Sequence, residues 1–175
     1  MSVAQILDIE IESENVTEYR SLRKGDQIAV EGEMEGIEYY HHGIFLGHEE
    51  GVADFGGNNK INARPRIVDL LQFTEYGKRR LLRIKYPSGQ CLPPERVLDN
   101  AQKIVDNPDS WGVYDLISNN CEHFATKCKT GVAVSRQVIN KIRECMMNPL
   151  QAIRYSMASS FSGGSSFSGS LKNLE

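Results

Sequence analysis

The sequence predicts an α+β domain, and two observations carry this prediction. Residues 39–46 and 52–55 are rich in aromatic and β-branched residues and flank a glycine-bounded turn, as in a β-hairpin. Apolar residues recur at helical spacing between Val97 and Val105. The chain has 175 residues, which is enough to bury a hydrophobic core of its own.

Further strands are predicted on both sides of the hairpin, where short apolar runs are bounded by glycine, proline or basic turns. Residues 31–36 and 56–65 are glycine-bearing polar segments and are predicted to be loops. Residues 1–22 mix apolar and acidic side chains, and no element is assigned to them. In chain order, the additional strands are expected at residues 27–30, 66–73 and 81–86.

Three helices are predicted in the second half of the chain. The first begins near Pro94, because proline suits the first turn of a helix, and it ends at Asn107. The second covers residues 122–129, after two asparagines that can cap it, and Gly131 ends it as a C-cap. The third covers residues 136–147.

The composition and charge exclude several classes of protein. The net charge is −3 and no long basic run exists, so nucleic acid is not the expected partner. No apolar stretch approaches the roughly 18 residues of a membrane span. No apolar segment follows Met1, so we expect a cytoplasmic protein without a signal peptide or transmembrane anchor. The four cysteines lack zinc-type spacing, and we expect reduced thiols and no metal site; they are Cys91, Cys121, Cys128 and Cys145.

Cys121 is the candidate nucleophile. It follows Asn119 and Asn120 and opens the helix predicted at residues 122–129. The unpaired amides and the dipole at a helix N-terminus favour a negatively charged sulfur there. A thiolate in that place can attack a carbonyl carbon if a base lies within reach. Taken alone, such a cysteine is more often a small buried apolar residue.

The base must be one of four histidines. His123 lies two positions after the cysteine and points to another side of the helix, whereas His48 lies in the hairpin turn. His41 and His42 are adjacent strand residues, so only one of them can face the cysteine helix. Gly43 would leave room for a helix end on the face of His41, which favours His41 and leaves His42 as the alternative.

Three strings together resemble the lecithin:retinol acyltransferase family, which includes the H-Ras-like suppressor phospholipase/acyltransferases. The resemblance extends from Gly25 to Val138 and implies a circularly permuted papain-like fold, in which the nucleophile helix packs on a small antiparallel sheet. We therefore divide the chain into an N-terminal segment 1–22, a domain 23–155 and a Ser/Gly-rich disordered tail 156–175. The strings are His41-His42-Gly43-Ile44-Phe45-Leu46-Gly47, Val52-Ala53-Asp54 and Asn120-Cys121-Glu122-His123-Phe124.

Carried over residue by residue, the resemblance implies that Cys121 is the nucleophile and His41 the general base. Asp54 falls at the third position, where the acyltransferases have a second histidine; a carboxylate there can still stabilise an imidazolium. The implied reaction transfers an acyl group from a lipid ester through a thioester and needs no cofactor. A lipid substrate would require peripheral contact with membranes, for which the apolar face of residues 136–157 is a candidate; the alternative, which we favour for this helix, is that it simply packs on the domain.

These roles make a geometric demand on the hairpin. His41 and Asp54 must point to the same face, and side chains in a strand alternate with period two. The sequence therefore predicts a two- or four-residue loop, or a bulge, within residues 47–51.

Two other functions remain open at this point. The first is a non-catalytic regulatory or scaffolding module, suggested by the changed third position and by a polar tail where the acyltransferases carry an apolar anchor. The second is a papain-like hydrolase of peptides or amides, because a fold does not fix the substrate.

Overall fold

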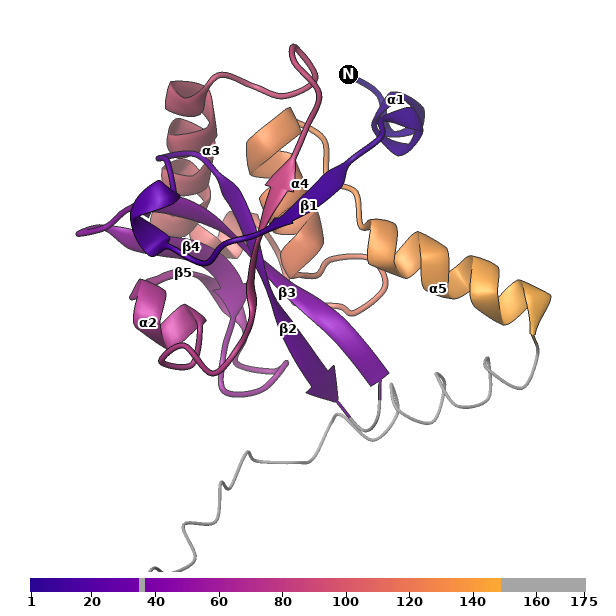
Figure 1. The fold of residues 1–175 in the computed structure, drawn as a ribbon. Helices are drawn as coiled ribbons and strands as arrows, with labels where there is room; N and C mark the ends of the chain where they lie inside the picture. The colour runs from indigo at the N-terminus through magenta and orange to yellow at the C-terminus, as the bar shows by residue number, and fades with distance from the viewer. Residues whose placement is uncertain (35–36, 149–175) are drawn as a thin grey trace, which may run out of the picture.

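The structure is a computed structural model that describes residues 1–34 and 37–148; the predicted tail 156–175 lies outside these residues. Within them, six strands form one open antiparallel sheet in the order β1-β6-β2-β3-β4-β5 (Figure 1). The predicted α+β class with a small antiparallel sheet is therefore confirmed. The strands are β1 (Glu12–Asn15), β2 (Gln27–Met34), β3 (Ile37–Gly47), β4 (Gly51–Gly56), β5 (Arg64–Val68) and β6 (Leu81–Lys85).

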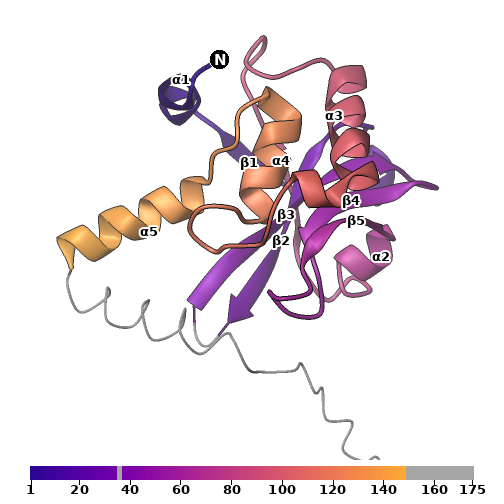
Figure 2. The same ribbon diagram turned by 180° about the vertical axis from the view of Figure 1, so that it is seen from behind.

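Helices lie on both faces of the sheet. The two central helices, α3 and α4, lie in front of the strands in Figure 2 and cover one face. The short helix α2 buries Leu70 and Phe73 against the opposite face, with Phe45 and Val52 of the hairpin. The helices are α1 (Val3–Asp8), α2 (Leu70–Phe73), α3 (Pro94–Asp106), α4 (Cys121–Thr130) and α5 (Arg136–Met147), with 3-10 turns η1 (Tyr19–Ser21) and η2 (Pro108–Ser110).

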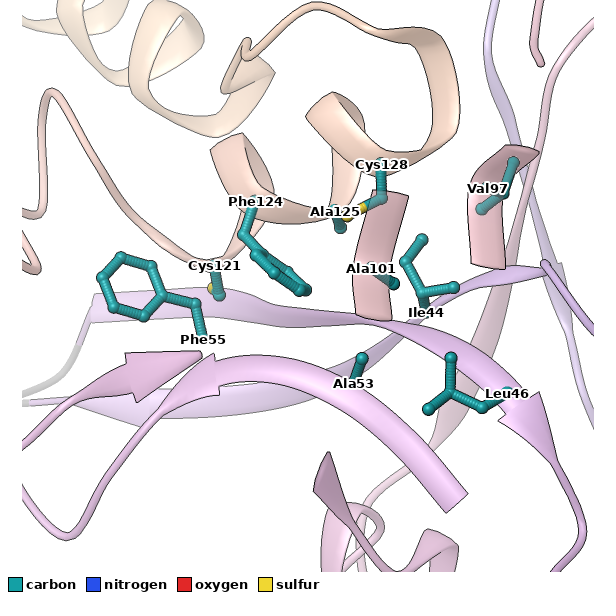
Figure 3. Close-up of a cluster of buried hydrophobic side chains, with 10 residues drawn as sticks. All are labelled: Ile44, Leu46, Ala53, Phe55, Val97, Ala101, Cys121, Phe124, Ala125 and Cys128. Carbon is teal, nitrogen blue, oxygen red and sulfur yellow. The ribbon is translucent and has the colours of Figure 1, made fainter. Parts of the chain in front are cut away.

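The core between α4 and the hairpin follows directly from the periodicities of helix and strand. Positions three and four apart share one side of a helix, and alternate residues share one face of a strand. The helix therefore presents one row of small and aromatic side chains, and the strands present the matching apolar row (Figure 3). The buried members are Ile44, Leu46, Ala53, Phe55, Val97, Ala101, Cys121, Phe124, Ala125 and Cys128.

Both predicted caps of α4 are confirmed, and the helix extends one residue beyond the predicted range 122–129 at each end. The Asn120 side-chain oxygen accepts hydrogen bonds from the backbone amides of Glu122 at 2.9 Å and His123 at 3.1 Å. Gly131 adopts φ 84°, a left-handed conformation that glycine takes without steric cost, and its amide closes the last turn. These caps set the residue at which the helix begins, and hence the position of Cys121.

Two predicted segments were wrong. The strand expected at residues 66–73 ends at Val68, because the Asp69 carboxylate accepts a hydrogen bond from the amide of Leu71 at 2.7 Å and caps α2. The loop expected from residue 31 onward is strand as far as residue 34, since β2 continues to pair with β3 there. The N-terminal segment, left without an element, supplies α1 and the edge strand β1.

The predicted bulge in the hairpin is confirmed. Phe45 lies opposite Val52, and Gly47 lies opposite Gly51, so that Leu46 is an additional residue on β3. The turn itself comprises residues 48–50. The resulting register places Asp54 directly opposite Gly43. His41 has the same parity as Gly43, and its side chain therefore shares a face with Asp54.

Replacing Phe124 with alanine tests the core between α4 and the sheet. This side chain is fully buried, and its removal leaves a cavity beside Trp111 and the β-hairpin. We expect the free energy of unfolding to fall by about 3–5 kcal/mol in urea titrations. Met146→Ala is the control, because Met146 is 78% exposed, and it should change stability by less than about 0.5 kcal/mol. Equal midpoints for the two variants would contradict this packing.

Candidate active site

Cys121 lies at the start of α4 and at the edge of the apolar core. Its side chain is only 3% exposed and lies between Phe55 and Phe124 (Figure 3). The sulfur is 3.8 Å from the carbonyl oxygen of Tyr40 on β3. The N-terminal end of α4 is therefore held against the strand that carries His41.

His41 is paired with Asp54. The ring nitrogen Nε2 of His41 is 2.8 Å from Oδ2 of Asp54, and the Asp54 side chain is 1% exposed. The imidazole also packs against the ring of Phe73, with centroids 5.4 Å apart. With Nε2 engaged by the carboxylate, Nδ1 is the ring nitrogen left to interact with Cys121.

The predicted reason for choosing His41 over His42 was wrong, although His41 is the histidine that interacts with Cys121. Helix α4 packs on the face of Ile44, which is the face of His42. Gly43 instead makes room for Val52 and Phe73, which lie 2.6 and 3.1 Å from the position of a Cβ added there. The β3–β4 ladder starts at Gly43 opposite Asp54, so His41 lies just outside it. We conclude that Cys121 reaches the imidazole beyond the end of this ladder.

The charge state of His41 follows from its neighbours. Burial of the ring lowers its pKa, but the negative charge at Cys121 and hydrogen bonds to Asp54 and to the Cys121 side chain act in the opposite direction. Together they raise the pKa of His41 to about 10. The imidazole therefore carries a proton at neutral pH and faces a sulfur on one side and a carboxylate on the other.

Asp54 has a second partner that the sequence did not reveal. Arg66 donates from Nε to Oδ1 of Asp54 at 2.9 Å and from Nη2 to Oδ2 at 3.4 Å. Burial alone would raise the pKa of Asp54, but hydrogen bonds and charges of His41 and Arg66 lower it. The carboxylate therefore stays ionised although water hardly reaches it.

Tyr114 is another residue of the site that sequence reasoning missed. Its hydroxyl lies near the side chain and the backbone amide of Cys121, and its ring centroid is 4.9 Å from that of Phe55. Burial and the adjacent negative charge at Cys121 raise the pKa of Tyr114, so it keeps its proton. Its position seven residues before the cysteine gives no periodic or motif signal.

The loop that carries Tyr114 is held by hydrogen bonds within residues 111–120. The Asn119 side-chain amide donates to the carbonyl oxygens of Trp111 at 3.1 Å and Val113 at 3.0 Å, both in the segment that leads into Tyr114. The Asp115 carboxylate accepts from the amide of Ser118 at 2.6 Å. The asparagine pair therefore has two tasks, since Asn120 caps α4 while Asn119 shapes the loop.

Gln137 on α5 connects strand β3, which carries His41, to helix α4, which carries Cys121. Its side chain accepts from the amide of Tyr40 at 2.6 Å and donates to the Tyr40 carbonyl oxygen at 3.0 Å. It also donates to the buried carboxylate of Glu122 at 3.2 Å, which in addition accepts from the Ser135 hydroxyl at 2.6 Å. Gln137 thereby fixes the residues next to His41 and next to Cys121 relative to each other.

The other histidines have local roles. His42 is buried, its Nδ1 lies 3.2 Å from Nε2 of Gln27, and burial lowers its pKa although the charge of Glu122 opposes this. His123 bonds the cap residue Asn120 through its ring, and burial lowers its pKa as well. His48 lies in the turn, as predicted, with its ring edge against Phe45.

A cavity of about 860 Å³ opens beside the imidazole of His41. Across residues 1–34 and 37–148, no three side chains of His, Cys, Asp or Glu converge to bind a metal ion. None of the helices in the described part of the chain is both long and apolar enough to cross a membrane. The cavity walls include His41, Asp54, Phe73 and Tyr114, and cationic side chains from Lys60, Arg66 and Arg79.

Comparison with known proteins adds a family. The sequence model described as "Lecithin retinol acyltransferase" matches residues 20–134, more than half of the chain. The "Egg-laying defective protein 26" of Caenorhabditis elegans is 25% identical over 141 residues, which cover 70% of this chain and 43% of that protein. The chain thus spans less than half the length of this curated relative. The match includes His41, Asp54 and Tyr114 as well as Cys121.

The charge at Cys121 should control the titration of His41. In Cys121→Ser the charge and the hydrogen bond that the sulfur contributes to His41 are lost, so we expect the pKa of His41 to fall from about 10 by about 1–3 pH units. Imidazole resonances followed by NMR against pH measure this directly. Cys145→Ser, which changes a half-buried thiol on α5, is the control and should leave the titration unchanged. A His41 titration that is identical in both variants would show that the two side chains do not interact.

Proposed function

The chain belongs to the lecithin retinol acyltransferase family, and on this premise we propose that it is a thiol-dependent acyltransferase or phospholipase acting on lipid esters. One observation carries the proposal: a single imidazole, that of His41, interacts with both the Cys121 thiol and the Asp54 carboxylate. This is the arrangement that nucleophile, base and orienting group require.

The first half of the reaction forms a thioester. The Cys121 sulfur attacks the ester carbonyl carbon, and the protonated His41 gives its proton to the departing alcohol oxygen as the carbon–oxygen bond breaks. In the second half, neutral His41 takes a proton from water, an amine or an alcohol as this acceptor attacks the thioester. The sulfur then leaves as thiolate, and His41 is again protonated. Asp54 stabilises the imidazolium at both stages.

The oxyanion that forms in each half-reaction needs hydrogen-bond donors. The backbone amide of Cys121 lies at the N-terminus of α4, where no helical carbonyl accepts from it. The Tyr114 hydroxyl, which lies near this amide and the sulfur and keeps its proton, is a second donor. Donors aimed at a developing negative charge from a site with little water contribute strongly to acyl transfer.

The arrangement of elements supports the circularly permuted papain-like fold that the resemblance implies. In papain-type enzymes the cysteine precedes the histidine in the chain. Here the strand β3, which bears His41, comes before helix α4, which bears Cys121, while the helix still packs on the sheet. We therefore infer the permuted order for the domain of residues 23–155.

We further infer a cytoplasmic enzyme that meets its lipid ester by peripheral contact with membranes. Helix α5 supports this, because Val138 is its buried residue whereas Ile142, Met146 and Met147 are exposed. Exposed apolar side chains on an amphipathic helix favour a membrane surface.

An acyl adduct on Cys121 is the decisive test. We expect a mass increase equal to one acyl group on the Cys121 peptide after incubation with phospholipid vesicles, and no adduct in Cys121→Ser or His41→Ala. Cys145→Ser and His48→Ala are matched controls and should retain the adduct. Peptide substrates provide a parallel arm, because turnover there alone would indicate a peptidase. A folded wild-type protein without an adduct in either arm would contradict catalysis and favour a scaffolding module.

Removing the Tyr114 hydroxyl tests the oxyanion assignment. We expect Tyr114→Phe to lower the rate of adduct formation by about 100-fold, because one donor to the oxyanion is lost while the ring still packs on Phe55. Tyr76→Phe is the control, since Tyr76 is 72% exposed. Unchanged adduct formation in Tyr114→Phe would leave the backbone amide as the operative donor.

A further inference from the structure

We propose that Arg66 is a positioning residue of this site: it keeps the Asp54 carboxylate ionised and fixes its rotation. The Asp54–Arg66 pair then takes over the task of the second histidine found in the acyltransferases that the chain resembles. This inference rests on the proposed function, because it assigns a role within the same group of reacting side chains. Arg66 works through Asp54 and His41 and does not itself touch the reacting sulfur.

The pairing of Asp54 with Arg66 is built into the sheet. Arg66 lies directly opposite Asp54 in the antiparallel pair of β4 and β5, where the Cβ atoms of facing residues are roughly 5 Å apart. A guanidinium on the neighbouring strand therefore reaches the carboxylate without a long or flexible path. The same face of the next strand, β3, carries His41, so that arginine, aspartate and histidine form a row across three strands.

The two carboxylate oxygens are divided between the two partners. Arg66 binds Oδ1 at 2.9 Å, whereas Oδ2 is 2.8 Å from His41 Nε2 and 3.4 Å from the Nη2 of Arg66. With Oδ1 anchored, the carboxylate plane cannot rotate freely, and Oδ2 stays directed at the imidazole. A carboxylate held in this way also orients the ring, so that Nδ1 points to the thiol.

Gly56 provides the space in which these three side chains meet. A Cβ added at this position would lie 3.1 Å from Oδ2 of Asp54, 3.2 Å from Nη2 of Arg66 and 3.3 Å from Cε1 of His41. Each of these contacts is tighter than an ordinary van der Waals contact. The glycine therefore serves the packing of this row, and its strand backbone requires no left-handed conformation.

The alternative is an ordinary surface ion pair, which contributes little to stability. Burial of the carboxylate argues against it, because the Asp54 side chain is only 1% exposed, whereas Arg66 reaches it from the surface with its own side chain 39% exposed. An unpaired carboxylate in that position would take up a proton more readily, and a neutral carboxyl group does not stabilise an imidazolium. In mildly acidic solution, the loss of Arg66 should therefore abolish the stabilisation of the His41 imidazolium by Asp54.

The test is the pH dependence of Cys121 alkylation by iodoacetamide, followed on the Cys121 peptide by mass spectrometry with the full chain. Removing Arg66 raises the pKa of Asp54, so that Asp54 takes up a proton at a higher pH and no longer stabilises the imidazolium there. The acid limb of the profile, which is the range where alkylation falls as the pH is lowered, should therefore move to higher pH by about one unit in Arg66→Ala. Arg66→Lys should lie between wild type and Arg66→Ala, because an ammonium keeps the charge but not the forked contact. Arg64→Ala, an exposed arginine of the same strand, should reproduce the wild-type profile.

A double variant separates positioning from folding. In the Asp54→Asn background, a further Arg66→Ala change should not move the acid limb, since its target is already absent. An Arg66→Ala profile equal to wild type, or a shift that persists in the Asp54→Asn background, would overturn the inference. Thermal unfolding checks the fold of each variant, and Arg66→Gln replaces Arg66→Ala if the latter does not fold.

Alkylation requires no lipid, so this result is independent of the acyl-adduct experiment. A shifted acid limb without an acyl adduct would sustain the role of Arg66 and reject the proposed function. An acyl adduct together with an unshifted acid limb would sustain the proposed function and reject the role of Arg66.

Discussion

Asp54 carries a negative charge in a place from which water is almost excluded, and much of the site serves to compensate this buried charge. A buried carboxylate is unfavourable unless cations and hydrogen bonds compensate it. Two neighbouring strands supply that compensation, with His41 on one side and Arg66 on the other. The compensation of this charge thus brings the His41 imidazole and the Arg66 guanidinium together at one carboxylate. It also requires the strand register that places these side chains next to Asp54.

Cys121 approaches the same imidazole from the other side of the sheet. Helix α4 packs on the face of Ile44, whereas His41 and Asp54 belong to the face of Phe45 and Phe73. The two groups meet because the β3–β4 ladder begins only at Gly43. Gln137 stabilises this meeting point by binding both the Tyr40 backbone and the carboxylate of Glu122, and it is therefore as much a part of the architecture as the caps of α4.

What the sequence predicted well was local. The hairpin, the caps at Asn120 and Gly131 and the bulge requirement all follow from residue types a few positions apart, and each is present. The proximity of Cys121 and His41 was predicted correctly only through the family resemblance. The argument that Gly43 leaves room for the helix on the face of His41 was wrong, because α4 packs on the opposite face. That argument assumed that a helix touches only the residues of the face that it covers.

The residues that sequence reasoning missed depend on contacts between distant segments. Arg66 meets Asp54 only through the register of β4 and β5, and the segment that bears it was expected to be a longer strand. Tyr114 reaches Cys121 because Asn119 folds the preceding loop back on itself. Neither contact has a periodic signature. The capping signal of Asp69, by contrast, was readable, because aspartate before a short apolar run is a common helix start.

The bulge at Leu46 has a consequence for how this hairpin tolerates insertions and deletions in evolution. The additional residue lies within β3, between Phe45 and Gly47. Asp54 therefore still pairs with Gly43 and stays on the face of His41. Losing one residue here would convert the bulge into a regular ladder and keep the carboxylate on its face. Losing one residue between Val52 and Asp54 would turn the carboxylate toward the opposite face. The loss of one residue is therefore compatible with the pairing of His41 and Asp54 at the bulge, and incompatible with it between Val52 and Asp54.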